Sequence, residues 1–279
     1  MATISEVLNG NPLPNSDCAR LDVELLLSHV LSCSPAYLRT WPDKTLSEQE
    51  VQLFYRLFRR RQRGEPIAYI LGERSFWTLD LNVSTDTLIP RPDTEILVEQ
   101  ALSLDLPSAA TILDLGTGTG AIALSLASER KTWQVTATDY LDKIVSLARQ
   151  NAKRNGIDNI DLLCSNWFES LPKKKYDLIV SNPPYIDQDD VHLSIGDVRF
   201  EPKSALVAEK LGLADVEHII ARSREYLSAN GWLMLEHGHQ QATEVAARFE
   251  KCGYQNINSI QDYGGNDRVT FAQYTESNQ

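Results

Sequence analysis

Cysteine, histidine and positive charge are all scarce in this sequence of 279 residues. It contains four cysteines and five histidines, and its formal net charge at pH 7 is −11. Because phosphate binding depends on clustered Lys and Arg, we expect no stable nucleic-acid binding by so acidic a chain. The cysteines are far apart with no Cys-x-x-Cys pair, which argues against a zinc site or a disulfide framework and favours reduced thiols. They are Cys18, Cys33, Cys164 and Cys252.

Metal-binding patterns and long apolar runs are missing too. His237 and His239 have no third ligand type at a useful spacing, so we expect no metal site. No run of about 20 apolar residues occurs, so no membrane-spanning helix is expected. Residues 1–12 carry no positive charge ahead of an apolar stretch and so lack the layout of a secretion signal. We expect a cytoplasmic, monomeric protein without membrane contact.

Two different patterns divide the chain. From Asp17 to Gly64, apolar residues recur at the three-and-four spacing of amphipathic helices, and Ser47 with Glu50 forms a capping box. Residues 76–83 alternate between apolar and polar, which predicts a short hairpin or an extended linker. We therefore predict a helical domain at 1–75, a hairpin or linker at 76–90 and a second domain at 91–279.

Strand-like and helix-like segments alternate after residue 107, which predicts an α/β fold with a parallel sheet covered by helices. The predicted strands are 111–115, 134–138, 161–165, 176–181, 232–236 and 268–274. The predicted helices are 121–129, 141–155 and 241–252.

A glycine-rich loop follows the first of these strands. Gly116, Gly118 and Gly120 would let the backbone approach a ligand closely, and Asp139 ends the next strand, where an acid can bind ribose hydroxyls. The same spacing satisfies the dinucleotide fingerprint, so a dehydrogenase is a rival interpretation. The acid Asp114 before the glycines and the third glycine favour S-adenosylmethionine, whose methionine moiety carries a cationic amino group.

Residues 182–185 read Asn-Pro-Pro-Tyr and follow the predicted strand 176–181. Pro183 is pushed toward an extended conformation by the next proline, which frees its carbonyl to face a substrate beside the Asn182 side chain. Two acceptors at one spot suit an –NH2 group on a planar π system, and Tyr185 can pack on that plane. Holding both protons favours the pyramidal nitrogen needed for methyl transfer, with no catalytic base required.

The chain resembles the HemK/PrmC family, the protein-(glutamine-N5) methyltransferases of peptide chain release factors. The resemblance covers nearly the whole length and rests on six segments, of which Pro-Arg-Pro-Asp-Thr-Glu is the most specific. They are 65–69, 88–95, 114–120, 182–185, 196–202 and 263–268.

The resemblance implies a helical substrate-docking domain joined to a class I methyltransferase domain with a Rossmann-like, seven-stranded, mostly parallel sheet whose last strand is antiparallel. It implies S-adenosylmethionine as methyl donor, S-adenosylhomocysteine as product, and the Gln of a Gly-Gly-Gln loop in class 1 release factors as acceptor. The implied cofactor-binding residues are Gly116, Thr117, Gly118, Thr119, Gly120, Asp139, Asn182 and Trp167, the last covering the adenine. The implied catalytic and substrate-binding residues are Asn182, Pro183, Pro184 and Tyr185.

Three points remain open at this stage. Many relatives have an acid where this chain has Asn166, so the adenine contact there is unassigned. The same Asn-Pro-Pro-Tyr logic fits an exocyclic amino group of a base, so a methyltransferase of adenine N6 or guanine N2 is the alternative function. A cofactor-binding regulatory protein without activity is a third possibility, which the intact 182–185 segment disfavours.

Five arginines crowd the end of a predicted helix, at positions 56, 59, 60, 61 and 63. A solvated face near a helix carboxyl end is the simpler interpretation. The alternative is a docking surface for an acidic patch on the partner or for RNA. Charge reversal at Arg60 and Arg61 should then weaken binding of the protein substrate and leave cofactor binding unchanged.

Overall fold

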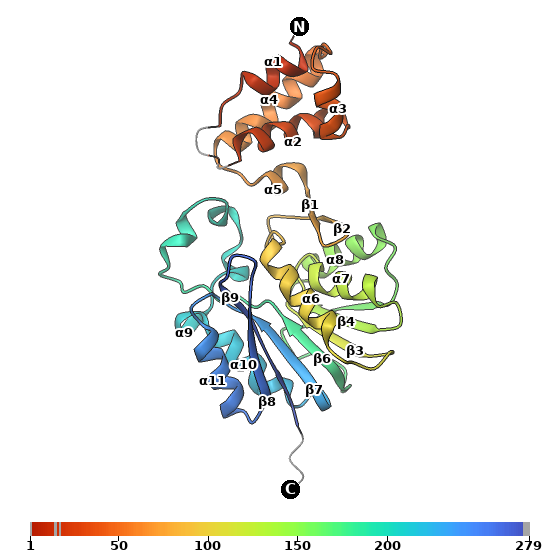
Figure 1. Cartoon of the computed structure of the whole chain (residues 1–279), viewed down its shortest axis with the longest axis vertical. Helices are drawn as coiled ribbons and strands as arrows, with labels where there is room; N and C mark the ends of the chain where they lie inside the picture. Colours follow the sequence, from red (N-terminus) through yellow and green to blue (C-terminus); the bar gives the residue numbers. More distant parts are fainter. Residues whose placement is uncertain (1, 14–15, 17, 276–279) are drawn as a thin grey trace. The chain divides into compact units, whose positions relative to one another are not determined.

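The structure is a computed structural model that describes residues 2–13, 16 and 18–275 (Figure 1). Asp17, where the predicted helical segment starts, lies outside these residues. The chain divides into two compact units. The first holds the described residues up to Glu73 together with Ser194–Phe200, and the second holds Arg74–Leu193 and the described residues from Glu201 on. No helix of the described chain is long and apolar enough to cross a membrane.

The first unit is a bundle of short helices. They are α1 (Ile4–Asn9), α2 (Ala19–Leu31), α3 (Pro35–Thr40), α4 (Glu48–Gln62) and α5 (Ile67–Leu71). The capping box predicted at the start of α4 is confirmed, because the Glu50 backbone N–H donates to Ser47 Oγ and Glu50 Oε2 accepts from the Ser47 N–H at 2.6 Å. Leu26, Leu27 and Phe54 are fully buried and form the centre of its apolar core.

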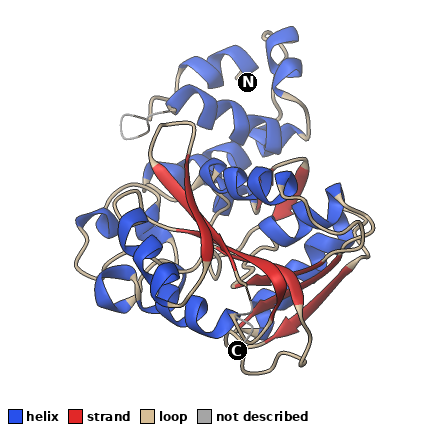
Figure 2. Cartoon of the chain, turned by 60° about the horizontal axis from the view of Figure 1, so that its bottom comes forward, coloured by secondary structure: helices blue, strands red, loops and turns tan. Residues whose placement is uncertain are grey.

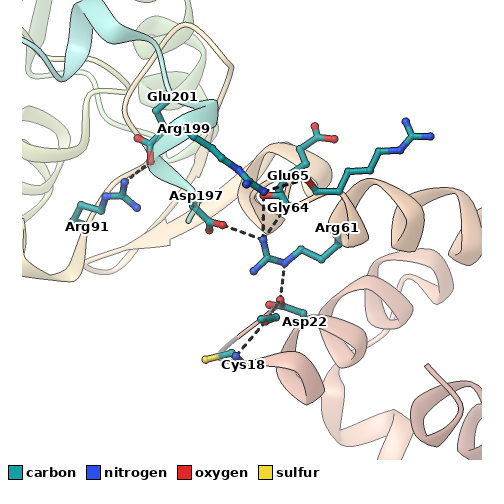
Figure 3. Close-up of polar contacts among 11 residues, drawn as sticks. Cys18, Asp22, Arg61, Gly64, Glu65, Arg91, Asp197, Arg199 and Glu201 are labelled. Carbon is teal, nitrogen blue, oxygen red and sulfur yellow. Dashed lines mark hydrogen bonds and ion pairs between the residues drawn. The ribbon is translucent and has the colours of Figure 1, made fainter. Parts of the chain in front are cut away.

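A buried ion cluster ties the segment Ser194–Phe200 to this bundle. The Arg61 side chain is only 12% exposed; its Nε donates to Asp22 Oδ2 at 2.7 Å and its Nη1 to Asp197 Oδ1 at 2.9 Å (Figure 3). Arg60 pairs with Glu65. The interpretation of all five arginines as one solvated face is therefore wrong for Arg61, whose charge is held inside the unit, while the partly exposed Arg60 is paired with Glu65.

The second unit begins with a hairpin of β1 (Glu73–Phe76) and β2 (Leu79–Asn82), followed by the 3-10 turn η1 (Pro92–Thr94) and α6 (Glu95–Ser103). The strands of its sheet are β3 (Thr111–Leu115), β4 (Gln134–Asp139), β5 (Ile160–Cys164), β6 (Tyr176–Ser181), β7 (Leu227–Glu236), β8 (Gln255–Gln261) and β9 (Asp267–Gln273). Its other helices are α7 (Ala121–Glu129), α8 (Asp142–Arg154), α9 (Glu209–Gly212), α10 (Ala214–Ser223) and α11 (Ala242–Lys251), and short 3-10 turns lie at Val191–Ser194, Val198–Phe200 and Lys203–Ala205.

The seven strands form one sheet in the order β5-β4-β3-β6-β7-β9-β8. All pairs are parallel except those of β9, which runs antiparallel to β7 and β8. This confirms the predicted fold class, a seven-stranded, mostly parallel sheet with an antiparallel last strand. Strands β4 and β5 follow β3 on one side of it, and the chain then crosses to the other side of β3 to form β6. Ligands of open α/β sheets bind at such a switch point, at the carboxyl ends of the strands.

Side chains alternate between two buried faces of the sheet. Ile112 packs against α6, α7 and α8, whereas its neighbour Leu113 belongs to the apolar cluster formed with α10 and α11. The helices accordingly cover both faces of the sheet (Figures 1 and 2). Burial on both faces explains the near-continuous apolar runs that predicted these strands.

Several elements escaped prediction, the helices α6 and α9 among them. Strand β8 is an edge strand whose polar side chains are mostly exposed, so it lacks the apolar alternation of a half-buried strand. Helix α10 was not assigned at all. Strand β7 begins at Leu227, five residues before the predicted start, and passes through Asn230 in a left-handed conformation.

We expect Arg61→Ala to lower the free energy of unfolding of the first unit by about 3 kcal/mol, because the change leaves two carboxylates without their shared partner and Asp22 is nearly buried. Urea titration followed by hydrogen exchange in α2 and α4 would measure it. The control is Arg56→Ala, at an exposed position of α4, which we expect to change the same free energy by less than about 0.5 kcal/mol. Equal effects of the two changes would contradict a structural role of Arg61.

Candidate active site

A cavity of about 280 Å³ lies at the carboxyl ends of β3, β4, β5 and β6. The register of the sheet produces it: Leu115 of β3 is the partner of both Thr138 of β4 and Ser181 of β6. The residues that follow these three, Gly116, Asp139 and Asn182, therefore leave the sheet side by side. All three line the cavity.

The glycine loop takes a path that side chains would obstruct. Gly116, Gly118 and Gly120 all have positive φ values, +72°, +56° and +88°. A Cβ on Gly116 would lie 3.4 Å from the Trp167 ring, and one on Gly120 only 2.8 Å from the Leu124 side chain. Gly116 through Thr119 line the cavity, whereas Gly120 packs behind the loop and starts α7.

Two buried acids hold the loop in different ways. Burial raises the pKa of Asp114 to about 7, and its Oδ2 accepts a hydrogen bond of 2.6 Å from the Thr117 hydroxyl. Asp114 is fully buried and does not line the cavity, and its bond to Thr117 braces the loop. Its expected place near the methionine amino group stays a prediction. Burial also raises the pKa of Asp139, whose Oδ2 accepts from the Gly118 N–H at 3.0 Å.

Asp139 lines the cavity at the end of β4. Its Oδ1 is buried, and hydrogen bonds from the backbone N–H groups of Leu141 and Tyr140 counter the rise that burial causes in the pKa of this carboxyl group. A carboxylate held at the end of this strand is suited to the ribose hydroxyls of a bound nucleoside.

An aromatic and polar edge follows β5. Trp167 lies against the glycine loop and hydrogen-bonds the carboxylate of Asp215, a residue of α10 that also lines the cavity. Asn166 donates its Nδ2 to Glu169 at 3.1 Å, which leaves its Oδ1 as an acceptor at the cavity wall. Asp215 was not singled out from the sequence, because α10 itself was not predicted.

The Asn-Pro-Pro-Tyr segment contributes two residues to the wall and two behind it. Asn182 and Pro184 line the cavity, whereas Pro183 is buried. Tyr185 also lies outside the wall: its hydroxyl donates to Glu236 Oε1 at 3.2 Å and its carbonyl accepts from Gln241 Nε2 at 3.0 Å. Burial raises the pKa of Tyr185 far above its usual range, so the phenol stays protonated.

The Pro-Arg-Pro-Asp-Thr-Glu segment forms the opposite side. Pro90, Arg91 and Thr94 line the cavity. The Arg91 guanidinium pairs with the buried carboxylate of Glu201, which also accepts from the backbone of residue 89 (Figure 3). Glu95 faces elsewhere and accepts from the Trp77 backbone N–H at 2.9 Å, so it braces the hairpin.

His237 is a buried residue of the sheet end, not a surface histidine. Its Nε2 lies 2.7 Å from the Thr270 hydroxyl and its Nδ1 2.9 Å from the Gly238 carbonyl, and burial lowers its pKa. Both ring nitrogens of this neutral histidine therefore have hydrogen-bond partners within the fold.

The residues around the cavity fit S-adenosylmethionine. Its volume is close to the lower end of the range for small-molecule sites, about 300–1,000 Å³. A glycine loop at a helix start, an acceptor on Asp139 and the ring of Trp167 supply the contacts that a nucleoside with an amino-acid tail requires.

Comparison with known proteins assigns both parts of the chain. Residues 11–72 match the PrmC N-terminal domain and residues 92–210 match the methyltransferase small domain. A release factor glutamine methyltransferase of Aliivibrio fischeri is 52% identical over 99% of this chain and 98% of its own length. That of Vibrio cholerae is 54% identical over 93% and 91%, and that of Escherichia coli 49% identical over 94% and 95%.

Solved structures agree on the fold. A methyltransferase from Pyrococcus furiosus matches 82% of this chain and all of its own with a TM-score of 0.56 at 18% identity. A 16S rRNA N2 G1207 methyltransferase of T. thermophilus, in complex with AdoMet and guanosine, matches 72% of this chain and 49% of its own with a TM-score of 0.51 at 18% identity. These two likenesses show the fold, and the family model shows that residues 92–210 form a methyltransferase small domain. With about half of its residues identical to these relatives over nearly its whole length, the chain belongs to the release factor glutamine methyltransferase family.

Proposed function

We propose that this protein transfers a methyl group to the side-chain amide nitrogen, N5, of the Gln in the Gly-Gly-Gln loop of class 1 peptide chain release factors, and that it does so in the cytoplasm, where translation takes place. The observation that carries the proposal is the placement of Asn182 directly beside the glycine loop at one edge of the sheet. A group held by Asn182 would face a ligand held by Gly116–Thr119. One chain supplies every wall residue named above, so we propose a monomer as the working form.

S-adenosylmethionine, when bound, supplies an electrophilic methyl group on a positively charged sulfur. Gly116–Thr119, Asp139, Asn166 and Trp167 would hold it, since all line the cavity. The protein must then bring the glutamine amide to the methyl carbon in line and keep water out, which can provide a large share of the acceleration.

The amide nitrogen is a poor nucleophile because its lone pair is delocalised into the carbonyl, the same conjugation that makes rotation about an amide bond cost roughly 18–20 kcal/mol. Asn182 Oδ1 and the Pro183 carbonyl would accept its two N–H bonds and favour a pyramidal nitrogen. The nitrogen then gains the methyl group and loses one proton to water. Tyr185 stays protonated and hydrogen-bonded to Glu236, so we assign it a supporting place in this arrangement rather than that of a base.

We propose further that α4 of the first unit is a docking surface for an acidic face of the release factor. Arg56, Arg59 and Arg63 are exposed and line a groove beside Tyr55. Unlike Arg61, they make no ion pair within the described chain. Three cations free of internal partners complement an acidic partner, and such surfaces act mainly on encounter and on KM.

Mass spectrometry of a purified release factor after incubation with this protein and S-adenosylmethionine tests the proposed reaction. We expect one added methyl group, located by fragmentation on the Gln of the Gly-Gly-Gln loop. A label that enters RNA or DNA instead, with the glutamine unmodified, would identify the enzyme as a nucleic-acid amino methyltransferase.

Asn182→Ala should lower kcat about 100-fold with cofactor affinity nearly unchanged, because it removes an acceptor that orients the reacting nitrogen. Stopped assays for kcat and calorimetry for S-adenosylmethionine binding would separate the two effects. Asp139→Asn is the matched comparison, since its carboxylate lies in the nucleoside part of the cavity and its replacement should weaken cofactor binding first. Equal losses of turnover and affinity in Asn182→Ala would mean that this residue mainly binds the cofactor.

Reversal of two docking charges, Arg56→Glu with Arg59→Glu, should raise KM for the release factor about tenfold, because exposed pairs contribute roughly 0.2–1 kcal/mol each and reversal adds repulsion. Methylation of a short Gly-Gly-Gln peptide should not change, since such a peptide lacks the acidic face that the docking surface would bind. Lys251→Glu, an exposed charge at the end of α11, is the control. An unchanged KM in the double variant would refute this surface.

A further inference from the structure

A buried polar cluster lies directly behind the residues that would hold the acceptor amide. Its members come from four separate segments: Thr94 from η1, Asn182 and Tyr185 from the turn after β6, Glu236 from the end of β7, and Arg268 from β9. Glu236 is 1% exposed and Thr94 4%. Three of the segments singled out in the sequence, 88–95, 182–185 and 263–268, therefore meet at one carboxylate.

The contacts form a chain from Glu236 to the cavity. Tyr185 Oη donates to Glu236 Oε1 at 3.2 Å. The Thr94 hydroxyl lies close enough to Glu236 to lower the pKa of this carboxyl group, although no donor meets Oε2 with regular hydrogen-bond geometry in the described part of the chain. Asn182 Nδ2 in turn donates to Thr94 Oγ1 at 3.3 Å. Thr94 thus lies between the buried carboxylate and the amide of Asn182.

The number of protons fixes the direction of this chain. A hydroxyl has one proton and an ionised carboxylate has none, so Thr94 must donate to Glu236 and can then only accept from Asn182. The –NH2 end of the Asn182 amide is thereby held toward Thr94, and its Oδ1 is turned away from Thr94. That orientation is the one the reaction needs, because an acceptor must meet the N–H bonds of the substrate amide.

We propose that Thr94 and Glu236 are positioning residues that decide which end of the Asn182 side-chain amide faces the substrate. The proposal rests on the proposed function, since it explains how the acceptor amide is recognised. Without the Thr94 hydroxyl, the two orientations of the Asn182 amide differ little in energy. In the flipped orientation, the NH2 group of Asn182 faces the N–H bonds of the substrate amide and cannot accept from them.

The ionisation of Glu236 makes this orientation sensitive to pH. Burial raises the pKa of Glu236 to about 7, against the stabilising hydrogen bonds from Thr94 and Tyr185 and the charge of Arg268, while Asp93 adds to the rise. Arg268 is itself paired with Asp262 at 2.9 Å, and His237 is neutral and bound to Thr270. Below the pKa, a protonated Glu236 can donate to Thr94, which frees the Thr94 proton for Asn182 Oδ1 and reverses the chain. We therefore expect kcat to fall as pH falls through about 7.

Thr94→Val is the main test, because valine keeps the shape of threonine and removes the hydroxyl. We expect kcat on the release factor to fall about 10- to 100-fold, with KM and S-adenosylmethionine affinity nearly unchanged. Thr94→Ser restores the hydroxyl and should recover most of the activity. Thr78→Val, at an exposed turn of the β1–β2 hairpin, should have no effect. A Thr94→Val enzyme with wild-type kcat, or a Thr94→Ser enzyme as slow as the valine variant, would overturn the proposal.

Glu236→Gln supplies the second variant. Its carboxamide does not ionise, so the rise of kcat between pH 6 and 8 expected for the wild type should disappear. A profile that keeps the same rise in Glu236→Gln would assign the titration to another group, such as Asp114, and would contradict the role of Glu236.

A readout without turnover keeps this inference separate from the proposed reaction. In protein labelled with 15N-asparagine, the side-chain NH2 signal of Asn182 should shift between pH 6 and 8 in the wild type but not in Glu236→Gln, and Thr94→Val should displace it at every pH. If the wild type methylated no release factor, the proposed function would fail while this experiment still decided the orientation of Asn182. An Asn182 signal that ignores pH and both substitutions would overturn the inference itself.

Discussion

The parallel pairing of β3 with β4 and β6 is the constraint on which the site depends. Parallel strands end at the same edge of a sheet, so the turns after residues 115, 138 and 181 leave from one line. The next pairing, Ser181 of β6 with Leu235 of β7, adds Glu236 to the same edge. The glycine loop, Asp139, Asn182 and Glu236 are thus placed by the register of the backbone before any side chain interacts. Because the side-chain period of a strand is two, a slip by one residue would exchange the two buried faces, and the apolar packing on both sides resists it.

This arrangement brings three carboxyl groups into a poorly solvated region, and each is stabilised differently. Asp114 is fully buried, and its side chain accepts a hydrogen bond from the Thr117 hydroxyl, which holds the glycine loop. Asp139 is tied to the glycine loop through its Oδ2 and lines the cavity. Glu236 is surrounded by hydroxyl groups and Arg268, and its pKa is raised to about 7. Acids with a perturbed pKa cluster at functional sites, because burial and neighbouring charges are arranged there around the groups that the site uses.

Local patterns in the sequence were sufficient to predict the residues that line the cavity after each strand. They were insufficient to predict the residues that pack behind them. The glycines, Asp139 and Asn182 each sit next to a strand with a clear apolar run, so both the strand and the functional residue could be predicted from neighbouring positions. Thr94 and Glu236 could not be paired, because they are far apart in the chain and no periodic pattern links them. Asp215 was missed with α10, and β8 was missed because its exposed polar side chains carry no alternation.

The arginines of α4 also have two different roles that their sequence alone does not separate. Positions 52, 56, 59 and 63 recur at the spacing of one helix face, and this face lines the groove. Arg61 falls outside that series and turns to Asp22 of α2, while Arg60 lies at its border and is held by Glu65. A helix with 3.6 residues per turn separates neighbouring charges by about 100°, so adjacent arginines can serve folding and recognition at once. The unpaired face is therefore the part of the cluster that remains available to a partner, because its charges are not consumed in stabilising the bundle.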